Sequence, residues 1–359
     1  MRVSFRVCKI AGLDIHIHLS LLIIIVLLTY AFYASQPPLG FSDFKNPTKI
    51  VLASIAAISI FVAILLHELA HSFIAMHYGI KVREIILFIF GGLAIMETLP
   101  KDPKKEFFIS IAGPLMSIAL ACTGLILSYI PIEEISAFFK LFGYFNMILA
   151  IFNLIPAFPM DGGRILRSIL AEKIGYVKAT KTAAEIGKAL AIFMGVIGLF
   201  YSPWLILIAF FIYIGAGEEE RMVTIENVLG KFKVKDIMST EIVTVSPEAT
   251  VKELLELMLK KKHLGYPVVE NDKLVGIVTL KDVIRADPSQ KIKEVMSRDV
   301  VTISPDAKAF DALKVMSERR IGRIPVTENS KLVGIISRSD LMKVTEILEV
   351  LEVLGWKRG

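Results

Sequence analysis

Two histidines and a glutamate lie close together in an apolar stretch of the chain, where residues 66–71 read Leu-His-Glu-Leu-Ala-His. Residues four apart lie on one face of an α-helix, so the imidazoles of His67 and His71 can reach one metal ion. Glu68 lies beside them and can take a proton from a metal-bound water. The pattern predicts zinc-dependent hydrolysis, and two buried core histidines are the alternative interpretation.

The residues around this motif indicate a membrane setting. Residues 50–66 are almost entirely apolar and long enough to cross most of a bilayer. Hydrophobic residues make up 54% of the chain of 359 residues, and the mean hydropathy is +0.63. Ionisable side chains at such depth are costly and usually mark function. We therefore expect a site that works inside a membrane.

The other apolar runs predict a polytopic α-helical membrane protein followed by a soluble α/β region. Six transmembrane helices are expected, the last of them short, at residues 19–34, 50–77, 107–130, 137–158, 183–201 and 204–217. Residues 85–96 are apolar but too few to span the bilayer, and Gly91-Gly92 interrupts them. A hairpin that dips into the membrane edge fits this segment.

The positive charges predict the orientation. The net charge is +6, and Lys and Arg gather before the first helix, after the second and fourth helices, and after the sixth. The positive-inside rule then places both termini and the soluble region in the cytoplasm of a multi-pass cell-membrane protein. The site would face the cytoplasm. This distribution does not indicate a nucleic-acid groove. Cys8 and Cys122 predict no disulfide framework.

A zinc ion held by two histidines needs a third protein ligand and one open position. Asp161 is our candidate, because Pro156 and Pro159 should end the fourth helix at the depth of the histidines. Gly162 and Gly163 would let the chain turn there. The competing acids lie in a charged loop and are better explained as solvated; they are Glu97, Asp102 and Glu106.

Asn153 is a polar residue in the apolar fourth segment. Its amide could donate a hydrogen bond to the oxyanion of a tetrahedral intermediate. A hydrogen bond between helices explains the same residue about as well.

These motifs together resemble the site-2 protease family of intramembrane zinc metalloproteases. The resemblance rests on His-Glu-Leu-Ala-His at 67–71, on Asn-x-x-Pro-x-x-x-x-Asp-Gly at 153–162 and on Gly-Pro-Leu-Met-Ser at 113–117. It covers about the first 217 residues, and Met160 departs mildly from the leucine of many members. The resemblance implies one Zn²⁺ bound by His67, His71 and Asp161, Glu68 as the catalytic base, and Asn153 holding the substrate or the intermediate.

The last third of the chain contains an internal repeat at an offset of 58 residues. Lys-Asp-Ile-Met-Ser at 235–239 matches Lys-Glu-Val-Met-Ser at 293–297, and Lys-Leu-Val-Gly-Ile occurs at both 273–277 and 331–335. The pattern is similar to a tandem pair of CBS domains. We therefore expect a transmembrane domain, a linker, two CBS domains and a tail, at residues 1–217, 218–233, 234–286, 291–345 and 346–359.

The CBS resemblance implies an adenine nucleotide (ATP, ADP or AMP) between the repeats. Its Ser/Thr-x-x-Asp ribose pattern occurs at Thr279 with Asp282 and at Ser337 with Asp340. Helix capping explains the same residues, because each Asp lies three residues after a hydroxyl at an expected helix start. The doubling of the pattern in register favours the nucleotide.

We expect an intramembrane zinc endopeptidase that cuts a transmembrane protein substrate in or near its membrane-spanning segment and is regulated through its CBS domains. A homodimer through the CBS domains is left open. The alternative is a CBS-regulated membrane transporter or a non-catalytic scaffold, and neither would need Glu68 between two histidines.

Overall fold

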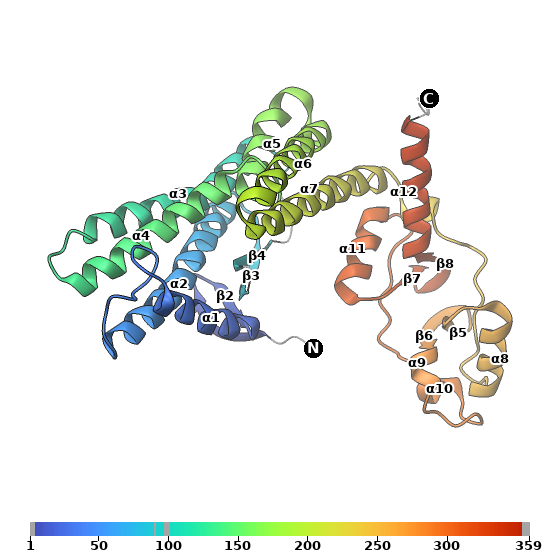
Figure 1. Ribbon diagram of the computed structural model, residues 1–359. Coiled ribbons are helices and arrows are strands. Elements are labelled where there is room, and N and C mark those ends of the chain that lie inside the picture. The colour runs from blue at the N-terminus through green and yellow to red at the C-terminus, as the bar shows by residue number, and fades with distance from the viewer. Residues whose placement is uncertain (1–3, 90, 97–100, 354–359) are drawn as a thin grey trace. The chain divides into compact units, whose positions relative to one another are not determined.

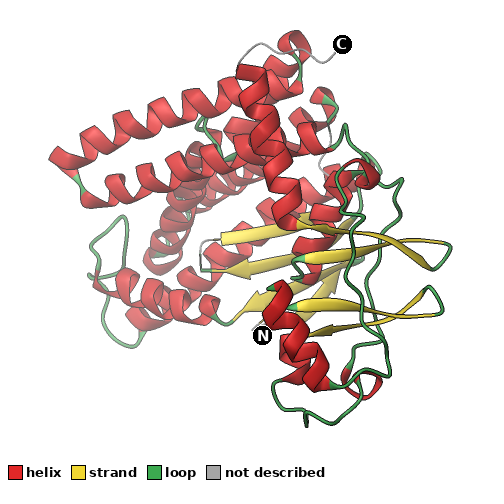
Figure 2. Ribbon diagram, turned by 90° about the vertical axis from the view of Figure 1, so that its right-hand side faces the viewer, coloured by secondary structure: helices red, strands yellow, loops and turns green. Residues whose placement is uncertain are grey.

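The computed structural model describes residues 4–89, 91–96 and 101–353. The chain divides into two compact units, Met1–Arg221 and Met222–Gly359. Figure 1 shows the elements of both units in chain order, and Figure 2 distinguishes their helices from their strands.

Seven helices form most of the first unit. They are α1 (Ser20–Ala34), α2 (Thr48–His77), α3 (Pro103–Leu127), α4 (Glu133–Leu154), α5 (Asp161–Ile174), α6 (Tyr176–Tyr201) and α7 (Pro203–Leu229), the last of which continues into the second unit. Within the described residues, four of them are long and apolar enough to cross a membrane: α2, α3, α4 and α6.

The two other expected spans are shorter. α1 has 15 residues, which gives a length of about 22 Å against a hydrocarbon core of about 30 Å. In α7 the apolar residues 203–217 are followed by three glutamates. A multi-pass membrane unit is therefore supported, while six spans remain a prediction.

A four-stranded sheet lies against α2, with β1 (Ser4–Ile10), β2 (Leu13–His18), β3 (Val82–Phe88) and β4 (Gly91–Met96) in that order. β2 and β3 are parallel, and the other two pairs are antiparallel. Leu13, Ile15 and Ile85 pack with Leu69 of α2 in one buried cluster. The expected hairpin at residues 85–96 corresponds to β3 and β4, and β4 lies at the edge of the sheet.

The fourth apolar run ends earlier than we expected. α4 stops at Leu154, and residues 155–160 form a non-helical connection before α5 begins at Asp161. Pro156 explains this end, because proline restricts the residue before it and cannot donate to the helix. Gly162 and Gly163 do not form the expected sharp turn of the chain, because they are helical. They lie in the first turn of α5, where a Cβ would overlap the backbone of the connection.

The second unit repeats one set of elements at the offset seen in the sequence. A 3₁₀ turn (Val234–Asp236) precedes α8 (Val251–Lys261), β5 (Gly265–Glu270), β6 (Lys273–Thr279), α9 (Leu280–Val283), α10 (Ile292–Val295), α11 (Ala309–Arg319), β7 (Arg323–Glu328), β8 (Lys331–Ser337) and α12 (Arg338–Val353). The strand order is β5-β6-β8-β7, so the two hairpins meet at β6 and β8.

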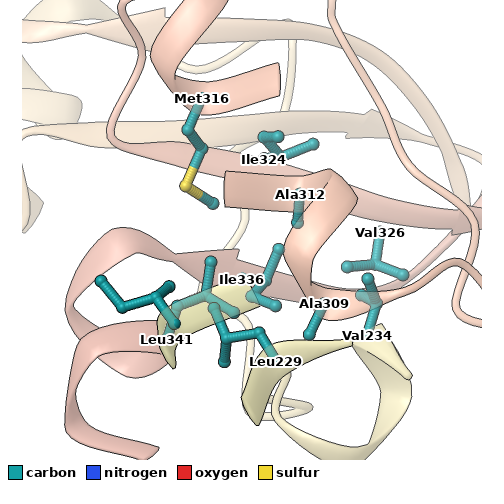
Figure 3. Close-up of a cluster of buried hydrophobic side chains, with 10 residues drawn as sticks. Leu229, Val234, Ala309, Ala312, Met316, Ile324, Val326, Ile336 and Leu341 are labelled. Carbon is teal, nitrogen blue, oxygen red and sulfur yellow. The ribbon is translucent and has the colours of Figure 1, made fainter. Parts of the chain in front are cut away.

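Each repeat contributes a short segment to the core of the other repeat. Val234 packs with Ala309, Val326 and other side chains of the second repeat, as Figure 3 shows. Ile292, at the start of the second repeat, packs with Val251 and other side chains of the first. The two cores therefore depend on each other.

The segment expected to be a linker is largely helical. α7 runs without a break to Leu229, and the boundary between the two units falls after Arg221. Leu229 is buried with Val234 in the core of the second repeat (Figure 3). The second repeat is therefore attached directly to the end of α7.

Candidate metal centre and active site

The two histidines of the motif face one point from consecutive turns of α2. The Nε2 atoms of His67 and His71 are 3.1 Å apart, and the two residues are only 4% and 7% exposed. The spacing of four residues produces this arrangement, because it brings the side chains onto the same face of the helix.

Asp161 reaches the same point from the first residue of α5. Its Oδ2 atom lies 3.2 Å from His67 Nε2 and 3.1 Å from His71 Nε2. The break between α4 and α5 makes this approach possible, since Gly162 and Gly163 allow α5 to pack tightly against the connection before it.

α3 orients both imidazoles from behind. His71 Nδ1 lies 2.6 Å from the backbone oxygen of Ile109, and His67 Nδ1 lies 2.8 Å from Ser117 Oγ. A carbonyl oxygen can only accept, so His71 Nδ1 is the donor and its neutral Nε2 presents a lone pair to Asp161. Gly113 lies between these contacts, and a Cβ there would overlap Nε2 of both histidines.

The donor set fits a zinc ion. Two nitrogens and one carboxylate oxygen, the only such cluster found among the described residues, lie close together and away from solvent. Zinc bonds of about 2.0–2.2 Å in a tetrahedron imply ligand separations of roughly 3.3 Å, close to the distances between these atoms. A neutral His71 Nε2 facing a carboxylate would be repelled without a cation between them. Three protein ligands leave one position open, as in catalytic zinc sites.

A cavity of about 430 Å³ opens beside these three residues. Glu68, Asn153 and Arg164 line it, together with residues of β4. Glu68 lies against Gly92 of β4, where a Cβ would be 2.5 Å from its Cγ. Glycine at this position therefore lets the strand approach the acid closely.

The structure brings together all five residues predicted from the sequence for this site: His67, Glu68, His71, Asn153 and Asp161. Asn153 differs from the expectation in one respect. Its amide nitrogen donates to the backbone oxygen of Leu149, 3.0 Å away and one turn earlier in α4. This hydrogen bond lies within one helix and not between two, and it occupies one of the two amide protons.

The three acids that competed with Asp161 as the third ligand differ in their surroundings. Glu97 lies outside the described residues. Asp102 caps α3 through the backbone N–H of Lys104, at 2.9 Å. The expectation that Glu106 is solvated is wrong, because its side chain is buried and accepts hydrogen bonds from Arg167. Sequence reasoning missed this pair, since its partners are 61 residues apart.

The four residues of the expected nucleotide site form two matching caps. Asp282 Oδ2 accepts from the N–H and the hydroxyl of Thr279, at 2.7 and 2.6 Å. Asp340 Oδ2 accepts from Ser337 in the same way, at 3.0 and 2.6 Å. The capping interpretation therefore describes these contacts, and each aspartate keeps its Oδ1 atom for another partner.

Sequence reasoning also missed the roles of two arginines and one backbone group. Arg164 lines the cavity one turn after Asp161, Arg167 is fully buried, and the carbonyl of Ile109 orients His71. The spacing of three and six residues from Asp161 could have drawn attention to the arginines. A backbone acceptor leaves no signal in the sequence.

Known proteins resemble both halves of the chain. A model of peptidase family M50 matches residues 55–133 and 130–194, and a CBS domain model matches residues 234–289 and 292–346. A zinc metalloprotease of Methanocaldococcus jannaschii is 39% identical over 357 residues, which is 99% of each chain. Rip3 of Mycobacterium tuberculosis is 28% identical over 98% of this chain and 95% of its own.

A solved site-2 protease from M. jannaschii is 40% identical and covers 61% of this chain and 95% of that chain, with a TM-score of 0.44. The apolar helices and the full-length relative define a membrane zinc metalloprotease. The chain belongs to peptidase family M50 and has a tandem pair of CBS domains. The resemblance to site-2 proteases noted in the motifs is thereby confirmed.

Proposed function

We propose that the chain hydrolyses a peptide bond in or near a transmembrane segment of a membrane-protein substrate, with His67, His71 and Asp161 as zinc ligands and Glu68 as the general base. The observation that supports this best is the meeting of the three ligand atoms within 3.2 Å beside a cavity that Glu68 lines. A transporter or a scaffold would not require an acid at this point.

The protein residues divide the chemistry between them. Zinc, when bound, polarises the scissile carbonyl and lowers the pKa of water. Glu68 takes the proton from the attacking water and delivers it to the leaving amine. The second amide proton of Asn153 and the guanidinium of Arg164 can donate hydrogen bonds to the developing oxyanion.

The substrate must be extended where it is cut, because a helix keeps its carbonyls in internal hydrogen bonds. β4 is at the edge of its sheet, and its residues 91–94 line the cavity. An unwound substrate segment would pair with this edge as an additional strand. The distribution of positive charges supports a cleavage step on the cytoplasmic side of the membrane, with both termini in the cytoplasm.

The second unit is proposed to bind an adenine nucleotide and to regulate cleavage. The doubled arrangement of Thr279 with Asp282 and of Ser337 with Asp340 supports this. Adenine nucleotides are also the ligands implied by the match to the CBS domain family. The Oδ1 atoms of the aspartates would accept from the ribose hydroxyls. Regulation requires that the nucleotide bind two arrangements of the pair with different affinity.

Glu68→Gln tests the proposal directly. Purified protein is incubated with solubilised membrane proteins, with and without a zinc chelator, and new termini are mapped by mass spectrometry. We expect chelator-sensitive cleavage by the native chain and none by Glu68→Gln, at equal zinc content. Glu172→Gln, an exposed acid on α5, is the matched control and should cleave normally. Native turnover in Glu68→Gln would refute the proposed base.

A further inference from the structure

Arg167 on α5 joins four neighbouring segments through one buried side chain. It is 0% exposed. Its Nε donates to Glu106 Oε1 of α3 at 2.9 Å, its Nη2 donates to the same oxygen, and its Nη1 donates to Glu219 Oε1 of α7 at 2.7 Å. The guanidinium lies 4.8 Å from the ring centroids of Phe158, before α5, and Tyr176, on α6.

The acceptor of this arginine belongs to the helix that orients the histidines. Glu106, Ile109, Gly113 and Ser117 follow one another at spacings of three and four, so they lie on one face of α3. The carbonyl of Ile109 and the hydroxyl of Ser117 hold His71 and His67. One face of α3 therefore contacts both histidines and the arginine.

Asp161 is connected to Arg167 through the first turns of α5. It begins α5, six residues before Arg167 and three residues after Phe158. The guanidinium thus contacts Phe158 in the segment before Asp161 and Tyr176 at the start of α6, the helix after α5.

We propose that Arg167 is a positioning residue for the metal centre: by tying α5 to Glu106 on α3, it sets the distance of Asp161 from His67 and His71. This inference rests on the proposed role of Asp161 as a zinc ligand. A metal ion tolerates errors of only about 0.2 Å in the placement of its ligands. Two of those ligands come from α2 and the third from α5, so the two helices need a common reference, and α3 provides it.

An arginine suits this role because its planar fork donates in several fixed directions at once. Lysine would keep the charge but could not keep three directed hydrogen bonds and two ring contacts. A simple stabilising ion pair predicts a different result, in which substitution lowers the stability of the fold without changing the geometry of the metal site.

Two variants and one matched control separate these interpretations in the full-length purified protein. Arg167→Lys removes the fork, and Glu219→Gln weakens the α7 side of the cluster. Glu220→Gln makes the same change at the next residue, where the carboxylate pairs with Lys188 of α6 at 2.7 Å. Zinc affinity is measured by competition with a chelator. The visible spectrum of the Co²⁺-substituted protein reports the ligand geometry.

We expect Arg167→Lys to bind zinc at least 10-fold more weakly, because loss of a residue that supports a metal ligand typically lowers metal affinity by about that factor. The variant should also shift the Co²⁺ bands. Glu219→Gln should shift both readouts in the same direction by less, and Glu220→Gln should match the native protein. These readouts do not depend on cleavage, and circular dichroism confirms the fold of each variant.

Asp161→Ala is measured first and should lose zinc. If it does, native zinc affinity and a native Co²⁺ spectrum in both Arg167→Lys and Glu219→Gln would overturn the inference. If Arg167→Lys does not fold, Glu219→Gln alone decides between the two results. Retention of zinc by Asp161→Ala would instead refute the proposed ligand, and the positioning role with it.

Discussion

The Nδ1 atom of His71 lies 2.6 Å from the backbone oxygen of Ile109, one turn beyond Glu106 on α3. This contact sets the tautomer of the imidazole, because the carbonyl requires the proton on Nδ1. The other ring nitrogen is then free to bind a metal ion. A backbone acceptor cannot be removed by a side-chain substitution, so the orientation of His71 is independent of the side chain at position 109.

Ser117→Ala should weaken zinc binding by about 10-fold, because the hydroxyl orients His67. The zinc affinity of the variant is measured by chelator competition. Ser54→Ala is the control, since its hydroxyl bonds only to the backbone of its own helix, at Ile50. Equal affinities of the two variants would show that Ser117 does not orient the ligand.

Gly113→Ala should abolish zinc binding, because the added Cβ would overlap the Nε2 atoms of both histidines. Zinc content after purification provides the measurement. Gly195→Ala makes the same change on α6, where the Cβ would meet only the Cβ of Ala209 at an ordinary 3.6 Å. We expect this control to keep its zinc, and a zinc-loaded Gly113→Ala protein would contradict the close approach.

Two truncations should differ in zinc affinity although they end only three residues apart. A chain ending at Arg221 retains the whole first unit, including Glu219. A chain ending at Glu218 loses the carboxylate that pairs with Arg167. We expect both to insert into membranes and the shorter one to bind zinc more weakly. Equal affinity would show that the α7 contact is dispensable.

Asp282→Ala combined with Asp340→Ala should abolish binding of adenine nucleotides to the second unit. Calorimetry with ATP, ADP and AMP on a segment beginning at Met222 tests this, because Ile225 and Leu229 belong to its core. These substitutions also remove helix caps.

Glu253→Ala is the control for that loss, since it removes a similar capping box from α8 at Thr250. It should leave binding intact. Absence of heat with all three nucleotides in the native segment would reduce both aspartates to helix caps, and binding that survives the double substitution would place the ligand elsewhere.

The dependence of the second unit's stability on pH should reflect two exposed carboxylates, each of which accepts hydrogen bonds from two lysines. Hydrogen bonds from Lys291 and Lys293 lower the pKa of Glu248 to about 2. Its pKa is thus lower in the folded than in the unfolded chain, so its stabilising contribution is present above the unfolded pKa of about 4.5 and is lost as the pH falls towards 2.

Asp306 behaves in the same way, because Lys235 and Lys233 lower its pKa to about 2. Carboxyl NMR titration of the segment beginning at Met222 measures both values. Since both groups are exposed, added salt should raise these pKa values towards normal. Ordinary pKa values at low salt would show that the lysine contacts do not persist in solution.

The long apolar helices could be predicted from the sequence because hydrophobic runs mark them directly. α2 and α6 each include the whole of the expected run, while α3 and α4 start four residues earlier and end three or four residues earlier than expected. α5 was not predicted. Its 14 residues include several charged side chains and no long apolar run, and tertiary contacts of Arg167 stabilise it. β1 and β2 were also missed. β1 pairs with β2, and β2 joins the sheet by pairing with β3, about seventy residues later, which local sequence does not reveal.

The site shows the same division. The fixed spacing of His67 and His71 revealed a shared face, and the prolines and glycines around Asp161 revealed a break in a helix. The reason for the glycines was not visible, because it lies in the close approach of α5 to the preceding connection. Likewise, the burial of Glu106 depends on a partner that local sequence cannot reveal.

The exchange of Val234 and Ile292 between the two repeats makes the pair indivisible. A single repeat would lack the residue that completes its own core, so half of the pair could fold only by trading segments with a second molecule. With both repeats in one chain, that exchange takes place within the molecule. Deletion of either repeat alone would therefore expose the core of the other.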